Sequence, residues 1–349
     1  MTLPDTTRFK QEDLVLKVTG DIDPTIFDIT KYEPFIESLC GKREFQAEAI
    51  RQVANFLFGG SYRDLRALAE ENFNSNPNLR EKYGELKAFE EALEFPNQLA
   101  CSLDLATGTG KSYVMYGLAR IALAEGKVDR VLLLCPSKTI ESGLTQKFLD
   151  LSKDRDLTSQ LPRNSKCKNP HLVNASETTV PGSICIENIH ATYSSTKSSI
   201  AASFKGKGGT TLVLCDEAHH ILTPEGDYDL RKWKEFLLSP EYGFKYIVGL
   251  SGTCYVGDEY FRDVISRYSL RQAIKDGVVK DVWYVQEDTS IDEYQKFQKI
   301  YDNHKKAKSE YREVKPLTVI VTKDIPACKT LEDDLVSFLS KHEKLSREA

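Results

Sequence analysis

The chain has 349 residues, enough for two or three domains of ordinary size. Charged residues make up 28% of the chain and hydrophobic residues 40%, which is typical of a globular protein and argues against disorder or a fibrous repeat. The net charge is −5, from 47 Lys+Arg against 52 Asp+Glu, which excludes a protein that coats nucleic acid through bulk positive charge. A local basic groove remains compatible with this balance.

No apolar run approaches the roughly 18 residues of a membrane-spanning helix, so we expect no membrane contact. The first ten residues are too polar for a signal peptide, and we therefore expect a cytoplasmic protein. Four of the eight cysteines lie inside apolar runs typical of buried strands, and no CxxC pair occurs. We therefore expect all eight to be reduced thiols rather than disulfides or zinc ligands.

Residues 1–40 are predicted to form an N-terminal arm, with a short strand or extended piece in LVLKVTGDI and a helix in KYEPFIESLC. Apolar positions at helical spacing then predict a helix over residues 45–57. Residues 60–96 are charged, rich in leucine and alanine, and broken by the loop signal NFNSNPN. They predict a helical insertion before the first core strand.

From residue 98 onward, strand and helix patterns alternate. Nearly continuous apolar runs at 98–105, 131–135, 183–189, 211–215 and 245–250 are typical of parallel strands covered on both faces. The alternation predicts an α/β fold, a doubly wound parallel sheet, in a lobe over residues 41–257. We expect residues 258–315 to be a connecting segment. Residues 316–349 read as one strand and one helix, which cannot bury their own faces, so we expect them to begin a second, truncated α/β lobe.

A glycine-rich turn, ATGTGKS, lies directly after the first core strand and directly before a helix. In that context the glycines permit close backbone approach, amide groups converge on phosphate oxygens, and the helix N-terminus adds a positive end. We expect Lys111 to reach the β- and γ-phosphates of a nucleotide and the Ser112 hydroxyl to bind Mg²⁺. One departure is Leu105, which occupies the position of the first glycine in the general pattern. The predicted loop residues are Thr107, Gly108, Thr109, Gly110, Lys111 and Ser112.

An acidic pair, Asp216–Glu217, follows the apolar run TLVLC. A carboxylate at the end of a buried strand lies where a phosphate loop holds its metal ion. We therefore expect Asp216 to bind Mg²⁺ through water and Glu217 to act as the general base on the attacking water. The predicted catalytic residues are Lys111, Asp216 and Glu217.

The phosphate loop and the DEAH sequence at 216–219 together resemble the superfamily 2 helicases and translocases. The resemblance implies a RecA-like fold, with ATP and Mg²⁺ as cofactors. In that family an aromatic and an amide side chain upstream of the phosphate loop contact adenine, which implies this role for Phe45 and Gln46. The family's DEAH histidine couples to an SGT triplet, which implies coupling by His219 with Ser251, Gly252 and Thr253.

Other segments match the family's nucleic-acid motifs in order. Pro136, Ser137 and Lys138, after the run VLLLC, match a motif that contacts the nucleic-acid backbone, and Asn188 falls where the next such motif is expected. Thr322–Lys323 follows the strand that begins the second RecA-like lobe in the family. Three segments are similar in sequence to the helicase subunits of type I and type III restriction enzymes. They are LATGTGKS, CPSKTIESG and YSLRQAIKDGVVKDVWY (residues 268–284).

In the family, arginines of the second lobe complete the nucleotide site, and an arginine at the γ-phosphate contributes roughly 10³–10⁵ in rate. No such motif occurs before Ala349. We therefore expect this chain to bind ATP·Mg and to turn it over slowly by itself.

The leading hypothesis is an ATP-driven motor on nucleic acid, with double-stranded DNA as substrate and a methyltransferase, specificity or nuclease subunit as partner. Two alternatives remain open at this point. One is a nucleotide-dependent binding switch or scaffold that does not translocate, which has no use for the general base Glu217. The other is an RNA helicase of the DExH kind.

Overall fold

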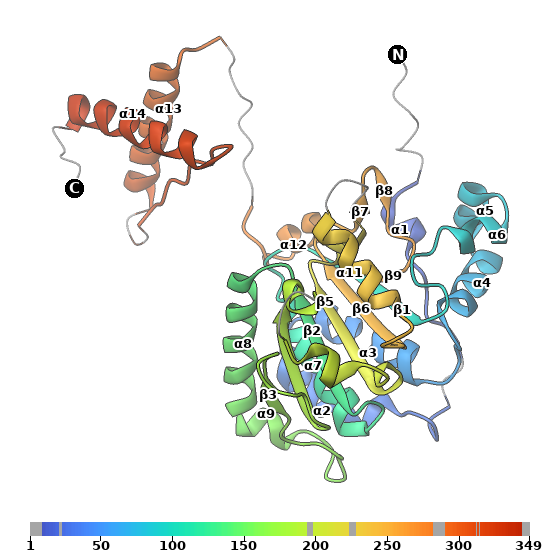
Figure 1. Ribbon diagram of the computed structural model, residues 1–349. Helices are drawn as coiled ribbons and strands as arrows, with labels where there is room; N and C mark the ends of the chain where they lie inside the picture. Colours follow the sequence, from blue (N-terminus) through green and yellow to red (C-terminus); the bar gives the residue numbers. More distant parts are fainter. Residues whose placement is uncertain are drawn as a thin grey trace. The chain divides into compact units, whose positions relative to one another are not determined.

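The computed structural model describes residues 9–20, 23–193, 198–222, 228–281, 290–311, 313 and 315–343 (Figure 1). The chain divides into two compact units, residues 1–281 and 282–349. The first unit contains the phosphate loop, the acidic pair and every other residue predicted to bind nucleotide or nucleic acid.

The first unit is built on a parallel sheet that has seven strands among the described residues. In order across the sheet, the strands are β3 (His171–Val173), β4 (Ser183–Asn188), β2 (Arg130–Cys135), β5 (Thr211–Asp216), β6 (Tyr246–Ser251), β1 (Leu99–Leu105) and β9 (Val264–Tyr268). All neighbouring pairs in this sheet are parallel. The predicted doubly wound α/β fold is therefore confirmed, and five of the strands are those expected from apolar runs.

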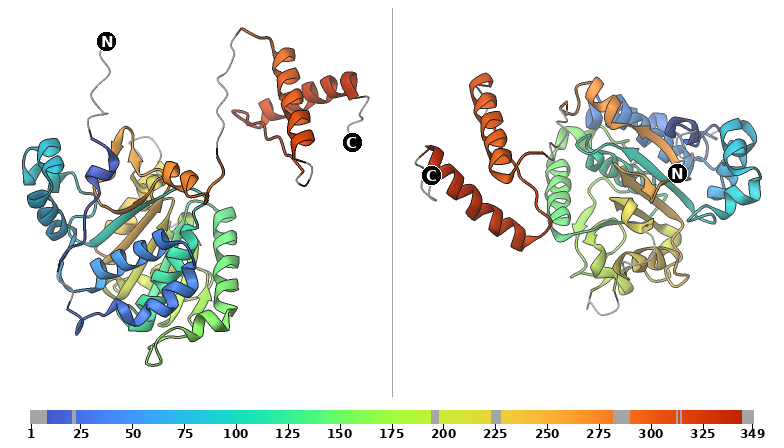
Figure 2. Two further views of the ribbon diagram at one scale, coloured as in Figure 1. Left: turned by 180° about the vertical axis from the view of Figure 1, so that it is seen from behind. Right: turned by 90° about the horizontal axis from the view of Figure 1, so that it is seen from above.

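Alternate residues of each central strand enter different cores, which explains why their sequences are apolar without alternation. In β2, Val131 and Leu133 join the core under the N-terminal helices, whereas Leu132 and Leu134 join the core on the opposite face. The helices α2 (Glu33–Cys40), α3 (Glu44–Phe58), α7 (Lys111–Glu125) and α8 (Lys138–Lys153) cover the first face. The short helix α10 (Ile200–Phe204) and α11 (Tyr228–Leu238) cover the other. Figure 2 shows α2 and α3, in blue, in front of the sheet in its left view.

The segment before β1 is helical, as predicted. It contains α4 (Leu65–Ser75), α5 (Pro77–Tyr83) and α6 (Leu86–Glu91), and the break between α4 and α5 is the single residue Asn76, whose side chain caps α5. In the N-terminal arm the described residues form α1 (Gln11–Leu14) and the 3₁₀ helix η1 (Ile29–Tyr32), with no strand over LVLKV. The arm nevertheless reaches the sheet, because the Leu16 amide donates to the Val264 carbonyl of β9.

The expected end of the first lobe at residue 257 needs correction. The sheet does not end there, because β9 and α12 (Leu270–Lys275) belong to the first unit, which extends to Asp281. A two-stranded hairpin, β7 (Tyr255–Val256) with β8 (Glu259–Tyr260), lies between β6 and β9. The last part of the family-like segment 268–284 lies outside the described residues.

The second unit contains α13 (Glu293–Glu310) and α14 (Ile325–Glu343), which pack through aromatic rings that include Phe297 and Phe338. The prediction of a strand after residue 316 is wrong for the described residues. Residues 315–322 are not hydrogen-bonded as a strand. Leu317, Val319 and Val321 are 81–86% exposed. A strand forms only when neighbouring strands satisfy its backbone groups, and none lies beside this segment in the described part of the unit.

The eight cysteines are free, as predicted, and six of them are buried. None of the helices described is long and apolar enough to cross a membrane.

Candidate functional site

The phosphate loop connects the carboxyl end of β1 to α7. Gly108 and Gly110 have φ values of +83° and +86°, a backbone region that residues with a Cβ rarely adopt. The Thr109 hydroxyl and amide both donate to the Ala106 carbonyl, at 2.6 and 3.2 Å, and close the turn. Leu105, which departs from the general glycine pattern, is the last residue of β1 and is buried. The turn itself therefore begins after it, and the departure does not affect the loop.

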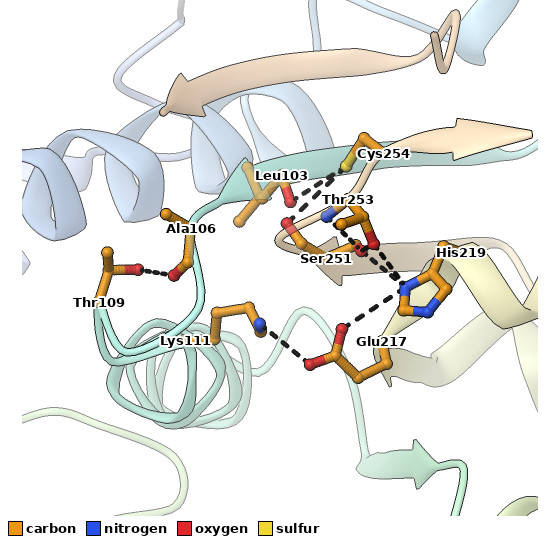
Figure 3. A network of polar contacts seen from close by, with 9 residues as sticks. All are labelled: Leu103, Ala106, Thr109, Lys111, Glu217, His219, Ser251, Thr253 and Cys254. Carbon is orange, nitrogen blue, oxygen red and sulfur yellow. Dashed lines mark hydrogen bonds and ion pairs between the residues drawn. The ribbon is translucent and has the colours of Figure 1, made fainter. Parts of the chain in front are cut away.

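The acidic pair lies beside this loop in space, although 104 positions separate Ser112 from Asp216 in sequence. The strand β5 ends at Asp216, and β6 alone separates it from β1 in the sheet. The Lys111 ammonium and the Glu217 carboxylate form an ion pair at 3.1 Å (Figure 3). Glu217 has a φ of +51°, the sole positive φ of a non-glycine residue in the described chain. The sharp bend at the strand end thus turns this carboxylate toward the lysine.

Asp216 is the buried member of the acidic pair. It is 7% exposed, and its Oδ1 atom is buried without a hydrogen-bond partner. Burial, with the neighbouring Glu217 charge, raises the pKa of Asp216 from 3.8 to about 6, and the Lys111 charge opposes the shift. A buried carboxylate oxygen without a donor fits a residue that meets a cation from solution.

One cavity of about 520 Å³ joins these groups. It is lined by Gly108, Gly110, Lys111, Ser112, Met115, Ile140, Gly143, Leu144, Lys147 and Asp216. No cluster of three or more His, Cys, Asp or Glu side chains able to hold a metal occurs among the described residues. A Mg²⁺ ion here would therefore depend on Ser112, Asp216 and oxygens from a bound polyphosphate, which is how Mg²⁺ is commonly held in nucleotide sites.

His219 connects the acidic pair to the SGT triplet (Figure 3). Its Nδ1 atom lies 2.8 Å from Ser251 Oγ, 3.3 Å from Thr253 Oγ1 and 3.5 Å from a Glu217 carboxylate oxygen. Burial, with the His220 charge, lowers the pKa of His219 below 6.5, so the ring is neutral at neutral pH. The ring therefore contributes hydrogen bonds rather than a charge to this network.

Gly252 brings the SGT triplet against the phosphate loop. A Cβ at this position would lie 2.9 Å from Thr107 Oγ1 and 3.0 Å from the Thr107 amide nitrogen. No side chain larger than hydrogen fits without moving the loop backbone. This contact supplies a steric reason for the glycine that the sequence motif alone did not provide.

The predicted adenine contacts, Phe45 and Gln46, lie at the start of α3. The Gln46 amide donates to the Thr109 carbonyl at 2.6 Å, and its Oε1 atom is buried without a partner. The Phe45 ring stacks on Tyr268, with centroids 3.8 Å apart and planes inclined by 4°. One face of Phe45 is thus already covered, and a nucleobase has only the other face and the ring edge. Tyr268 is not among the residues predicted from the sequence at this site. Its position in the family-like segment YSLRQAIKDG is the sequence feature that could have indicated it.

The residues predicted to touch nucleic acid follow β2 and β4. Ser137 caps α8 by accepting from the Ile140 amide at 3.4 Å, and Lys138, the first residue of that helix, is exposed. Asn188 is 4% exposed, and its side-chain amide donates to Glu141 and Glu187. Its Oδ1 atom accepts from the His190 amide. Asn188 is therefore engaged in internal hydrogen bonds, and its contact with a nucleic-acid strand stays a prediction.

These segments meet at one edge for a topological reason. The phosphate loop, the Pro136–Lys138 segment, the acidic pair and the SGT triplet all lie at the carboxyl ends of parallel strands, which share one edge of a sheet. The groups predicted to act on a nucleotide and the exposed Lys138 therefore lie at the same edge of the sheet.

Gly252→Ala tests the contact between the SGT triplet and the phosphate loop. The added methyl group meets backbone, so we expect a loss of about 1–3 kcal/mol in the free energy of unfolding together with weaker nucleotide binding. Gly209→Ala is the matched control, because a Cβ there meets nothing within 4 Å. Thermal unfolding and nucleotide titration measure both effects, and equal behaviour of the two variants would contradict the contact.

Asp216→Asn tests the cost of burying this carboxylate. A raised pKa means that the folded state binds more protons than the unfolded state between about pH 4 and 6, so ionisation destabilises the fold above that range. We expect the variant to be more stable than the parent by on the order of 1–3 kcal/mol at pH 8, and the difference to vanish near pH 4. Denaturant unfolding at several pH values, with the exposed Asp258→Asn as control, measures this. A pH-independent difference would contradict the assigned cause.

Comparisons with known proteins give a family match and a structural likeness. The family model described as type III restriction enzyme, res subunit, matches residues 40–256, well over half of the chain. Among solved structures the chain is similar to the UvsW helicase from bacteriophage T4, with 17% identity, a TM-score of 0.28, and coverage of 48% of this chain and 51% of that one. The chain thus spans about half the length of that helicase. No curated protein matches it. Because the family model matches more than half of the chain, the chain belongs to the res-subunit family of type III restriction enzymes, within the superfamily 2 helicases.

Proposed function

We propose that the first unit binds ATP·Mg in the cavity at the phosphate loop and hydrolyses the ATP to drive movement on double-stranded DNA. The observation that carries this proposal is the 3.1 Å ion pair between Glu217 and Lys111, because Lys111 lines the cavity together with Ser112 and Asp216. A lysine, a hydroxyl and a buried carboxylate at one cavity, with a base paired to the lysine, are parts that phosphoryl transfer to water requires.

The Lys111–Glu217 pair also suggests how binding prepares hydrolysis. A triphosphate competes with Glu217 for the lysine, because both are anions that the ammonium can neutralise. Once Lys111 turns to the phosphates, the Glu217 carboxylate is free to accept a proton from water. In this proposal Ser112 and Asp216 hold Mg²⁺, which supplies charge neutralisation at the phosphates.

The His219 network is the proposed route from nucleotide to nucleic acid. His219 contacts Glu217 on one side and Ser251 and Thr253 on the other, and the SGT triplet touches the phosphate loop through Gly252. A change in the position of Glu217 therefore alters the hydrogen bonds of the triplet. Coupling through such a shared network is the role that we propose for His219, Ser251, Gly252 and Thr253.

Contacts to DNA are proposed for the segment at the start of α8. Lys138 supplies an exposed cation there, and Pro136 and Ser137 hold the backbone of the turn. Phosphate contacts of this kind carry no sequence information and weaken with salt. We propose that Pro136, Ser137 and Lys138 do not recognise a DNA sequence. We also propose that they do not bind a nuclease, methyltransferase or specificity partner.

We propose that the 349-residue chain hydrolyses ATP slowly when it is alone. Among the described residues that line the cavity, none is an arginine. An arginine at the γ-phosphate typically contributes roughly 10³–10⁵ in rate. We therefore expect a site without one to bind ATP but to hydrolyse it slowly.

Two substitutions at the ion pair separate binding from chemistry. Lys111→Ala removes the charge that faces the triphosphate, and we expect ATP binding to be lost. Glu217→Gln keeps the shape but removes both the base and the competing anion, so we expect ATP affinity equal to or above the parent and hydrolysis reduced by about 10²–10⁴. Titration with a fluorescent ATP analogue and phosphate release measure the two quantities. Loss of ATP affinity in Glu217→Gln would contradict the assigned role.

Stimulation by nucleic acid tests the motor proposal. We expect double-stranded DNA to raise the rate of phosphate release more than RNA duplexes do, with a stimulation that falls as salt rises. Lys138→Ala is expected to weaken the stimulation at a given DNA concentration, whereas Lys153→Ala, at the other end of α8, leaves it unchanged. The absence of stimulation by any nucleic acid would leave only a nucleotide-dependent switch, and preference for RNA would favour the DExH helicase alternative.

A further inference from the structure

The cavity at the phosphate loop contains a second lysine that the motif does not include. Lys147 comes from α8, the helix that follows β2, and lines the same cavity as Lys111, Ser112 and Asp216. Two turns of α8 face the cavity, through Ile140, Gly143, Leu144 and Lys147. The wall opposite the phosphate loop is thus apolar except for one cation.

The Lys147 ammonium lies over the ring of Tyr113, 4.4 Å from its centroid. Tyr113 directly follows Ser112, so the cation is held at the first turn of α7, where the loop amides and the helix N-terminus face an anion. The Arg43 guanidinium approaches the same ring at 5.9 Å. Two cations therefore gather on a tyrosine beside the phosphate loop.

One of the two lysines that line the cavity has no carboxylate partner in the described part of the chain. Lys111 is neutralised by Glu217, whereas neither Lys147 nor Arg43 forms an ion pair with a carboxylate within the described part of the chain. Asp216 is the one carboxylate among the described residues that line the cavity. A cation–π contact at a partly exposed ring is weak, so the ammonium can leave the ring when a stronger partner arrives.

A simpler account is that Lys147 only covers the tyrosine with its aliphatic stem, as surface lysines often do. That account explains the contact with Tyr113 but not why the lysine lines the cavity together with the phosphate loop. A polyphosphate in the cavity explains both, because its oxygens would lie among the loop amides, Lys111 and Lys147.

We infer that Lys147 is a second phosphate-binding lysine, which contacts the triphosphate of the nucleotide from α8. The inference rests on the proposed function, since it names a further residue of the same site. It also gives α8 two different proposed partners. Lys138, proposed to contact DNA, and Lys147 are nine residues apart on one helix, about 14 Å along its axis. A shift of α8 on nucleotide binding therefore moves the DNA contact as well.

The test compares Lys147→Ala with Lys153→Ala, which removes a lysine from the exposed last turn of the same helix. ATP and inorganic tripolyphosphate are titrated by calorimetry into the parent chain and both variants, in the presence of Mg²⁺. We expect Lys147→Ala to bind both ligands about tenfold or more weakly and Lys153→Ala to bind them like the parent. Lys147→Arg restores most of the affinity, because it keeps the positive charge. Circular dichroism and thermal unfolding verify that each variant is folded.

The outcomes separate this inference from the proposed function. If the parent chain does not bind ATP, the proposed function itself fails. If the parent binds ATP and Lys147→Ala binds ATP and tripolyphosphate equally well, the inference fails and the proposed function stands. Equal weakening in Lys147→Ala and Lys153→Ala would reveal a general effect of charge and overturn the specific contact. Weakening for ATP without weakening for tripolyphosphate would place Lys147 at the nucleoside and would likewise overturn it.

Discussion

The structure depends on one constraint, the parallel direction of its strands. Parallel strands present all their carboxyl ends at one edge of the sheet, so loops far apart in sequence meet there. The phosphate loop after β1 and the acidic pair after β5 become neighbours in this way, and Lys111 and Glu217 reach ion-pair distance. The SGT triplet, which begins at the last residue of β6, lies between them because β6 separates β1 from β5 in the sheet.

Two residues at this edge of the sheet have energetically unfavourable conformations or surroundings. Glu217 holds a left-handed backbone conformation, and Asp216 keeps a carboxylate in a buried position with an unsatisfied oxygen. Both cost stability, and neither is needed to fill the core. In the proposed function they serve a site whose cation and anion arrive from solution. The apolar strands, covered on both faces by helices, supply the stability that makes such features tolerable.

Contacts between side chains of different elements give the site its detail. Tyr268 covers one face of Phe45, Gly252 lies against Thr107, and Lys147 reaches the cavity from α8. Each of these brings together residues that are not neighbours in the sequence. The cavity at the phosphate loop is therefore lined by residues of the loop, of α7 and α8, and of the end of β5.

The sequence by itself determined the fold class, five of the sheet strands, the phosphate loop and the acidic pair. It did so because continuous apolar runs, glycine-rich turns and strand-end carboxylates are local patterns with local physical causes. Tertiary structure decided which residues those patterns bring together. Asn188 matched a motif but is buried in hydrogen bonds to Glu141 and Glu187, and β9 joins the sheet although its sequence, with a serine and an arginine inside, does not read as a core strand. The apolar segment at 316–322 has strand-like residues without neighbouring strands in the described unit, because β structure is a property of pairing rather than of one segment.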